Sequence, residues 1–233
     1  MTVSQSSNDY LSLTNSPRLR QSYLDRLTTT PSILGSTGSR LLSGSHPAHT
    51  HLETRFSRFF EAPASLLFNS GWDGNVSFFS TVPQSSDWVI YDELVHASVH
   101  SGLRASRVPL ERRLLFSHNR LGSLRKVLKR IEKDGSGPTV FLALESLYSM
   151  DGDFAPLKEM LDVLDEHVPR ERQCVVLDEA HSTGIYGGRG RGVAHLLSEA
   201  GAERGRVGVR LMTFGKAVGC SGGAYLTHRR EGY

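Results

Sequence analysis

The chain has 233 residues, of which 38% are hydrophobic and 22% charged, which suits one large domain with a buried core. The formal net charge is only +3, and the basic clusters at 112–113 and 125–133 have no aromatic residues between them. These clusters are typical of solvated faces, so we expect no nucleic-acid partner. Two cysteines provide no disulfide framework, and no apolar run approaches a membrane span, so we expect a reducing compartment and no membrane partner.

Apolar periodicity and turn residues divide the first half of the chain into short elements. In chain order we expect a helix at 16–29, a Gly/Ser-rich loop at 34–47, a helical segment at 51–60, a strand at 65–68, a helix from the turn at 70–75 to about residue 81, a strand at 88–91, a helix beginning at 96–101 and an extended segment at 105–110.

The second half continues the alternation of helices and apolar runs. We expect a helix at 121–133, an apolar run at 139–144, a helix at 157–167 entered through Pro156, apolar runs at 174–177 and 207–213, and a strand at 222–227. Short apolar strands that alternate with helices predict an α/β fold with a mostly parallel sheet.

Chemically distinctive side chains follow the last two apolar runs. Asp178 and His181 come directly after the run at 174–177, and Lys216 lies among small residues after the run at 207–213. The spacing fits one intervening helical and loop segment, so the two strand ends can converge in space. A carboxylate that faces a ring nitrogen and a lysine that faces an aldehyde are what pyridoxal 5′-phosphate (PLP) needs. From the residues alone, Asp178 could equally cap a helix.

Other motifs carry weaker signals. His46, His49 and His51 lack a clear carboxylate or thiol partner set, so we expect no metal site. The segment 151–153 (DGD) lacks the remaining ligands of a calcium loop. The glycines of 184–192 do not follow the dinucleotide-binding pattern at a helix start, and this segment is interpreted as a mobile loop near the site.

Four motifs in order resemble those of the α-oxoamine synthases, which belong to the class II aminotransferase-like PLP enzymes of fold type I. They are Gly35 to Gly44 (GSTGSRLLSG), Glu145 to Asp153 (ESLYSMDGD), Asp178 to Gly184 (DEAHSTG) and Thr213 to Lys216 (TFGK). The segment 8–11 (NDYL) also matches, and the resemblance runs from about residue 7 to 227. It implies the three-layer major domain of PLP-dependent transferases, with a mostly parallel sheet flanked by helices.

The resemblance also implies a domain organisation. Residues 1–233 correspond to the PLP-binding large domain, and residues 1–34 correspond to the N-terminal segment and helix that lead into it. Members of the family are longer, so relative to them we expect the chain to be truncated at both ends. The helix before Asn8 and the small C-terminal domain would be the missing parts.

The resemblance also implies the principal roles of four residues at the cofactor. Lys216 would link covalently to the aldehyde of PLP, and Asp178 would pair with the pyridinium nitrogen. His96 would stack on the face of the ring, and His181 would reach the phenolic oxygen. The resemblance therefore implies Lys216, His96 and Asp178 as catalytic residues. The alternatives remain that His96 is a histidine without a partner at a helix N-terminus and that His181 is an ordinary turn histidine.

The remaining predicted cofactor ligands are glycine, tryptophan and hydroxyl residues. Gly71 and Trp72 open a helix after a strand, where backbone N–H groups and the helix dipole favour a phosphate. The family usually has another aromatic residue where Trp72 stands. Ser149 and Thr213 match positions whose hydroxyls hydrogen-bond the cofactor, although both residue types are ordinary in loops.

The resemblance implies a PLP-dependent acyltransferase. It would condense an amino acid, with L-alanine favoured, with a pimeloyl-CoA-like acyl-CoA, losing CO2 to give an α-amino ketone, as in biotin biosynthesis. The alternatives are another α-oxoamine synthase or an aminotransferase of the 5-aminolevulinate, sphingoid-base or secondary-metabolite pathways, or a non-catalytic fragment. By resemblance we expect a homodimer. No targeting signal is visible, so we expect a cytoplasmic location, or a peroxisomal one if a C-terminal signal has been lost.

Overall fold

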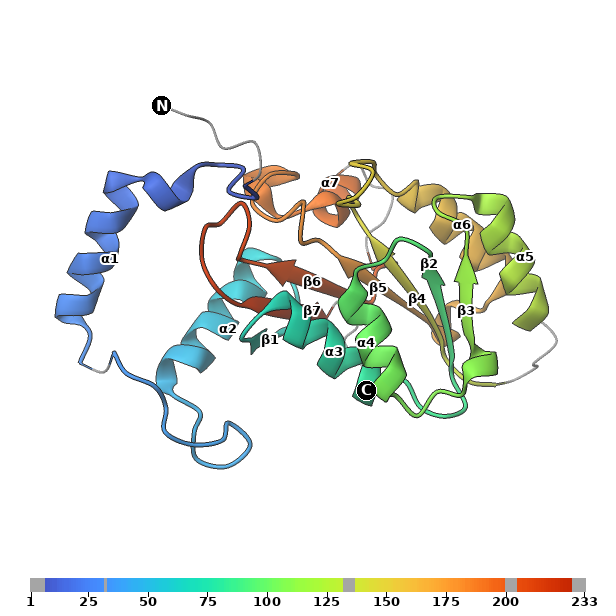
Figure 1. Cartoon of the computed structure of the whole chain (residues 1–233), viewed down its shortest axis with the longest axis horizontal. Helices are drawn as coiled ribbons and strands as arrows, with labels where there is room; N and C mark the ends of the chain where they lie inside the picture. Colours follow the sequence, from blue (N-terminus) through green and yellow to red (C-terminus); the bar gives the residue numbers. More distant parts are fainter. Residues whose placement is uncertain (1–6, 32, 132–136, 200–204, 228–233) are drawn as a thin grey trace.

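A seven-stranded sheet forms the centre of the molecule (Figure 1). The computed structural model describes residues 7–31, 33–131, 137–199 and 205–227. In spatial order the strands are β1, β7, β6, β5, β4, β2 and β3. Their bounds are β1 Ala64–Phe68, β2 Trp88–Asp92, β3 Arg113–Phe116, β4 Val140–Glu145, β5 Gln173–Asp178, β6 Val209–Thr213 and β7 Gly223–Thr227.

Helices alternate with the strands along the chain. The α-helices are α1 Pro17–Thr29, α2 Pro47–Phe59, α3 Gly71–Thr81, α4 Ala97–Ala105, α5 Leu121–Ile131, α6 Leu157–His167 and α7 Val193–Glu199. Four short 3-10 helices complete the described elements: η1 Leu13–Asn15, η2 Leu110–Arg112, η3 Arg170–Arg172 and η4 Gly188–Gly190. The end of the helix predicted at 121–133 lies outside the described residues.

The sheet is mostly parallel, which confirms the predicted fold class. Strands β3, β2, β4, β5 and β6 pair in parallel from neighbour to neighbour. The exception is β7, which runs antiparallel between β6 and β1. All six residues of β4 and all six of β5 are buried, because helices cover both faces of the sheet at its centre.

Two apolar cores lie on opposite faces of the sheet. One contains the inward residues of α5 and α6, including Leu124, Leu128 and Met160. The other contains residues of α3 and α4, including Phe79 and Val99, and these two helices lie in front of the sheet in Figure 1. The result is the three-layer arrangement, with the apolar side chains of the central strands β4 and β5 alternating between the two cores.

The extended segment predicted at 105–110 is wrong. Helix α4 continues to Ala105, η2 follows, and the edge strand β3 begins only at Arg113. The buried side chain of Val108 produced the apolar signal, but its carbonyl accepts a hydrogen bond from Arg113 Nε at 2.7 Å. This bond closes a turn at 108–113 instead of adding a strand to the sheet.

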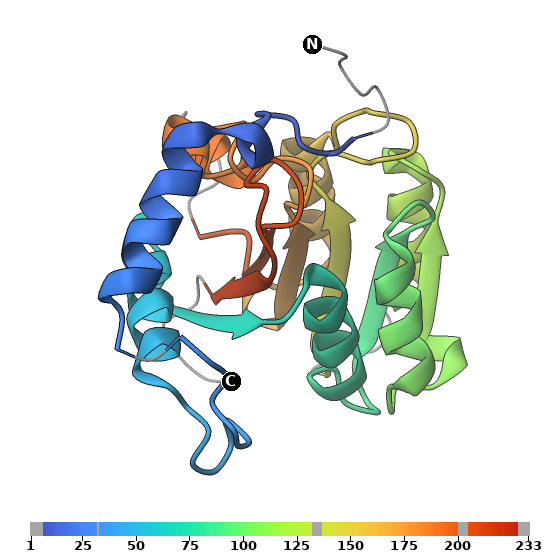
Figure 2. The same ribbon diagram turned by 60° about the vertical axis from the view of Figure 1, so that its left-hand side comes forward.

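Helices α1 and α2 lie at one end of the molecule (Figures 1 and 2). The predicted helix at 16–29 is present as α1, which has no buried residue. Helix α2 begins at Pro47, four residues before the predicted start, because His46 and His49 form a capping box at its first turn. No helix within the described ranges combines the length and the apolar character needed to cross a membrane.

Candidate active site

The chemically distinctive residues gather at the carboxyl edge of the central strands. Asp178 is the last residue of β5 and is paired in register with Leu211 of β6 and with Glu145, the last residue of β4. Helices α3 and α4 begin at the same edge, at Gly71 and Ala97. In open α/β sheets this edge is where ligands bind.

Both carboxylate oxygens of Asp178 are held by donors. Oδ2 accepts from Asn75 Nδ2 at 2.9 Å, and Oδ1 accepts from the backbone N–H of Ala180 at 2.9 Å. Asp178 is only 8% exposed, so these bonds fix the carboxylate at the end of its strand. Asn75 comes from α3, and no local pattern in the sequence marks it as a partner of Asp178.

His96 is the N-cap of α4 and lies against Trp72. Its Nδ1 is 2.7 Å from Ser98 Oγ, and its ring meets the indole edge to face with centroids 5.6 Å apart. Burial lowers the pKa of His96, the Asp178 carboxylate raises it, and the Lys216 ammonium lowers it, with a net lowering. His96 is therefore a neutral imidazole at neutral pH.

His181 is held by a residue from the N-terminal segment. Its Nδ1 lies 2.7 Å from the hydroxyl of Tyr10. Burial, followed by the nearby Lys216 and His96 side chains, lowers the pKa of His181 to about 4. Because Tyr10 occupies Nδ1, Nε2 is the ring nitrogen without a hydrogen bond among the described residues. The motif at 8–11 was noticed in the sequence, but nothing there indicated contact with His181.

Lys216 lies in the short connection from β6 to β7. The connection is closed by backbone hydrogen bonds from Phe214 N to Gly222 O at 3.0 Å, Cys220 N to Phe214 O at 2.8 Å and Gly219 N to Lys216 O at 2.9 Å. The charge of Lys216 lowers the pKa of both His96 and His181. The lysine therefore shares one electrostatic environment with the two histidines.

The start of α3 lies directly against the end of β6. A Cβ at Gly71 would collide with the hydroxyl of Thr213, and a Cβ at Gly223 of β7 would lie 3.1 Å from the Gly71 nitrogen. Glycine at both positions allows the helix start to approach the sheet. The structure thus brings Gly71, Trp72 and Thr213 to the edge that carries Lys216, as the sequence predicts.

Glu145 was not among the predicted site residues, but it lies at the same edge and is buried. Burial and, to a smaller extent, the neighbouring Asp178 carboxylate raise the pKa of Glu145 to about 8. A carboxyl group with a raised pKa beside a second carboxylate is a frequent property of functional sites. The sequence signal that could have identified Glu145 is its position as a charged residue at the end of the otherwise apolar strand β4.

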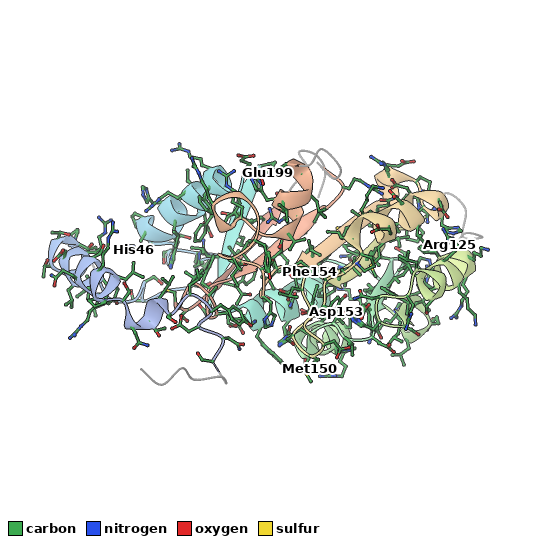
Figure 3. The ribbon with its side chains drawn as sticks, turned by 90° about the horizontal axis from the view of Figure 1, so that it is seen from above. His46, Arg125, Met150, Asp153, Phe154 and Glu199 are labelled. Atoms are coloured by element: carbon green, nitrogen blue, oxygen red, sulfur yellow. The ribbon has the colours of Figure 1, made fainter. Side chains whose placement is uncertain are left out.

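Ser149 is the predicted ligand for which the described residues show no contact with the other predicted ligands. It is exposed, in the loop that follows β4. The loop is fastened by an isolated bridge between Leu147 and Phe154 and by the contact of Asp153 with His118 Nε2 at 3.1 Å. Figure 3 shows Met150, Asp153 and Phe154 gathered in this loop. No hydrogen bond among the described residues joins Ser149 to Asp178 or Lys216.

The histidines considered as metal ligands have local roles. His46 Nδ1 accepts from Ala48 N at 3.1 Å, and His49 Nδ1 accepts from His46 N at 3.2 Å. Within the described part of the chain, no group of three or more His, Cys, Asp or Glu side chains is arranged to hold a metal ion.

The residues at this edge fit PLP by the chemistry of their donors. Asp178 is a buried carboxylate for a ring nitrogen, Lys216 is an amine for an aldehyde, and the α3 start supplies N–H groups for a phosphate. Glycine is needed at position 71 because any side chain there would collide with the hydroxyl of Thr213. This combination is that of a PLP-binding large domain.

The comparison with known proteins shows the family of the chain. The sequence model of the family "Aminotransferase class I and II" matches residues 3–231, so the chain belongs to that family. The relatives it resembles are α-oxoamine synthases, and both the expected family and its PLP dependence are confirmed.

Individual relatives support the same assignment. The chain is 44% identical to the 8-amino-7-oxononanoate synthase of Emericella nidulans, over 96% of this chain and 55% of that protein. It is 38% identical to the aminoacyl transferase sphA of Byssochlamys spectabilis, over 94% of this chain and 47% of that protein. The structure of Sphingomonas wittichii serine palmitoyltransferase superposes with a TM-score of 0.81 at 31% identity, covering 96% of this chain and 52% of that one. The chain thus spans about half the length of the relatives it matches.

Proposed function

We propose that the chain binds PLP through Lys216 and forms the cofactor-binding half of an acyltransferase that joins an amino acid to an acyl-CoA with loss of CO2. The observation that carries the proposal is the convergence of Lys216, Asp178, His96 and His181 at one sheet edge beside the start of α3. The similarity to two α-oxoamine synthases supports the reaction class.

Bound PLP supplies an electron sink that stabilises negative charge at the α-carbon of an amino acid. Asp178 holds a proton at the ring nitrogen, because its carboxylate is buried and oriented by Asn75 and Ala180. His96 covers one face of the ring as a neutral imidazole. His181 presents Nε2 to the phenolic oxygen, with Nδ1 already paired to Tyr10.

Lys216 has two roles in this proposal. Its Nζ would hold the aldehyde of PLP, and as a free amine the same group would be the base for the α-proton of the amino acid. The backbone bonds of the 214–222 connection keep the lysine at the sheet edge in both roles. The start of α3, at Gly71 and Trp72, binds the phosphate through backbone N–H groups, and Thr213 and Ser149 contribute hydroxyls.

The substrates we favour are L-alanine and a pimeloyl-CoA-like thioester, which is the reaction implied by similarity to 8-amino-7-oxononanoate synthase. A second candidate is the condensation of another amino acid with a longer acyl-CoA, supported by the similarity to serine palmitoyltransferase. A homodimer is part of the proposal, and the exposed apolar face of α1, with Leu19, Tyr23 and Leu24, supports it.

The test is the absorption spectrum of the purified chain with added PLP. We expect a visible band that is absent in the Lys216→Ala variant and present in the Lys126→Ala variant, whose lysine lies on α5. Addition of L-alanine, glycine or L-serine should then change the band with one amino acid and identify that substrate. A folded wild-type chain without any band would contradict the proposal and favour a non-catalytic fragment.

A further inference from the structure

The side chain of Asn75 is hydrogen-bonded to three residues beside the ring site. It is 2% exposed and comes from the first turns of α3. Its Nδ2 donates to Asp178 Oδ2 at 2.9 Å and to Ser98 Oγ at 3.0 Å. Its Oδ1 accepts from the hydroxyl of Tyr225 at 2.7 Å. Both amide protons and the carbonyl are thus occupied without any water.

The orientation of this amide is determined by its partners. Tyr225 is buried, and its hydroxyl is a donor to Oδ1. If the amide were turned over, its carbonyl oxygen would face the Asp178 carboxylate, and two acceptors would meet without a proton between them. Only the orientation with the NH2 group toward Asp178 satisfies every group.

The orientation has a consequence for His96. Because Ser98 Oγ accepts from Asn75, its own proton is available for His96 Nδ1, 2.7 Å away. The backbone N–H of Ser98 also points to Nδ1, at 3.3 Å. Nδ1 is therefore an acceptor of two hydrogen bonds, and the single proton of the neutral imidazole must be on Nε2.

The charged groups around His96 come from three other strands and loops. The carboxylate of Asp178 at the end of β5 favours protonation of the imidazole, and Lys216 in the β6–β7 connection opposes it. The carboxyl group of Glu145, at the end of β4, accepts a hydrogen bond from the backbone N–H of His96. Trp72 contacts the ring through its edge and carries no charge.

We propose that Asn75 is a positioning residue that sets both sides of the ring site at once: it orients the Asp178 carboxylate and, through Ser98, fixes His96 as the neutral tautomer with its proton on Nε2. The inference rests on the proposed function, in which Asp178 and His96 flank the ring. It adds a specific protonation state, with an N–H rather than a lone pair on the free nitrogen of His96.

The test is ¹⁵N NMR of the full chain labelled in histidine and measured without PLP at neutral pH. The His96→Gln variant assigns the His96 signals. We expect Nδ1 to show the shift of an unprotonated ring nitrogen and Nε2 that of a protonated one. A proton on Nδ1 in the wild-type chain would overturn the proposal, and this measurement requires no variant of Asn75 to fold.

Variants then test whether Asn75 is the cause. The Asn75→Asp side chain has the same shape but accepts where the amide donates, so the Ser98 hydroxyl should turn away from His96. We expect Nδ1 to become protonated and the pKa of His96 to rise, because a second carboxylate then lies near the imidazole. Ser98→Ala should change the tautomer in the same direction, while Ser80→Ala on α3, whose hydroxyl bonds only within its helix, should leave His96 unchanged.

Binding of PLP gives a second readout. In Asn75→Asp, which loses the hydrogen bond to the charged Asp178, we expect the dissociation constant for PLP to rise about tenfold. Tyr225→Phe loses a neutral hydrogen bond to Asn75, and we expect a smaller rise of about fivefold. An Asn75→Asp chain that is folded and keeps the wild-type tautomer and affinity would overturn the inference. A wild-type chain that has the expected tautomer but no affinity for PLP would contradict the proposed function alone.

Discussion

Glu145 makes the unfolding free energy depend on pH in a direction opposite to that of most carboxyl groups. Its pKa is raised to about 8 from 4.5, so the folded chain holds the proton more tightly than the unfolded one. The stability that this proton contributes is present below pH 4.5 and is lost as the pH rises through 8. His181, whose pKa is lowered to about 4, has no effect above pH 6.5.

Replacement of Glu145 by glutamine should remove this dependence. Between pH 6.5 and 9 we expect the wild-type unfolding free energy to fall by about 2 kcal/mol more than that of Glu145→Gln. Urea denaturation at several pH values measures the difference. Glu166→Gln, at an exposed residue paired with Arg125, is the control and should follow the wild-type curve; parallel curves for Glu145→Gln would show that Glu145 is ionised throughout.

Tyr10→Phe should weaken PLP binding without unfolding the chain. The variant loses the hydrogen bond to His181 Nδ1, so the imidazole is less well held, and we expect a three- to tenfold rise in the dissociation constant, about 1 kcal/mol. A fluorescence titration with PLP measures it. Tyr23→Phe on α1, where the ring is 65% exposed, should bind like the wild type, and equal affinities for both variants would contradict a role for Tyr10.

Some site residues could be predicted from the sequence because their signal is local. Asp178 and Lys216 each follow an apolar run, and the end of a parallel strand is where a functional side chain is expected. Asn75 and Tyr10 could not be predicted, because their partners are far away in the sequence and only the packing of α3 and the N-terminal segment reveals them. The assignment of the PLP ligands themselves remains a prediction.

At the scale of the elements, α3 and α4 pack closely because of one glycine. A Cβ at Gly102 of α4 would lie 2.8 Å from the Cβ of Phe79 and 3.0 Å from the carbonyl oxygen of Asn75. The backbone of Asn75, whose side chain orients Asp178, is therefore part of the contact between α3 and α4.

We expect Gly102→Ala to lower the unfolding free energy by about 1–3 kcal/mol, because the two helices must move apart. Gly122→Ala on α5 is the matched control, since no atom lies within 4 Å of its Cβ position. It should be neutral or stabilising by up to about 1 kcal/mol. Chemical denaturation of the two variants measures both values, and equal stabilities would contradict the close packing.

The elements that the sequence predicts correctly have strong periodicity or complete burial. The helix at 157–167 agrees with α6 in both bounds, and the run at 174–177 lies inside β5. Strand β3 was not predicted, because its burial alternates over only four residues at the edge of the sheet. Helix α7 was missed since its seven residues follow a glycine-rich segment, and its start depends on the distant Glu179.

At the scale of the whole molecule, a buried ion pair joins three elements. Glu179, directly after β5, accepts from Arg210 of β6 at 2.9 Å and from the backbone N–H of Val193 in α7 at 2.7 Å. Arg210 is 2% exposed and Glu179 is 0% exposed. If one of the two were removed, water could not solvate the charge of the other.

Arg210→Met should therefore lower the unfolding free energy by about 3–5 kcal/mol, the cost of leaving a buried charge unpaired. Arg125→Met removes an ion pair of similar geometry with Glu166, but on the exposed face of α5, where Figure 3 labels it. We expect that change to cost less than about 1 kcal/mol. Thermal denaturation compares the two, and similar losses would mean that the Glu179 pair is solvated.

The parallel sheet could be predicted as a whole, because alternating helices and apolar strands leave little choice of fold class. The order of the strands could not. The position of β7 between β6 and β1 depends on backbone pairing with a strand from the first third of the chain, and no local pattern in 222–227 indicates it.

The position of β7 determines when the candidate site can form during synthesis. Strand β1 is an edge strand whose neighbour in the described sheet is β7, so it has to wait, during synthesis, for residues 223–227 to emerge. Until then the start of α3 is not held against Thr213, and the lysine connection has no second strand to close it. Strands β2 to β6 can therefore pair while the chain is still being synthesised, and the candidate site is complete only after β7 has joined the sheet.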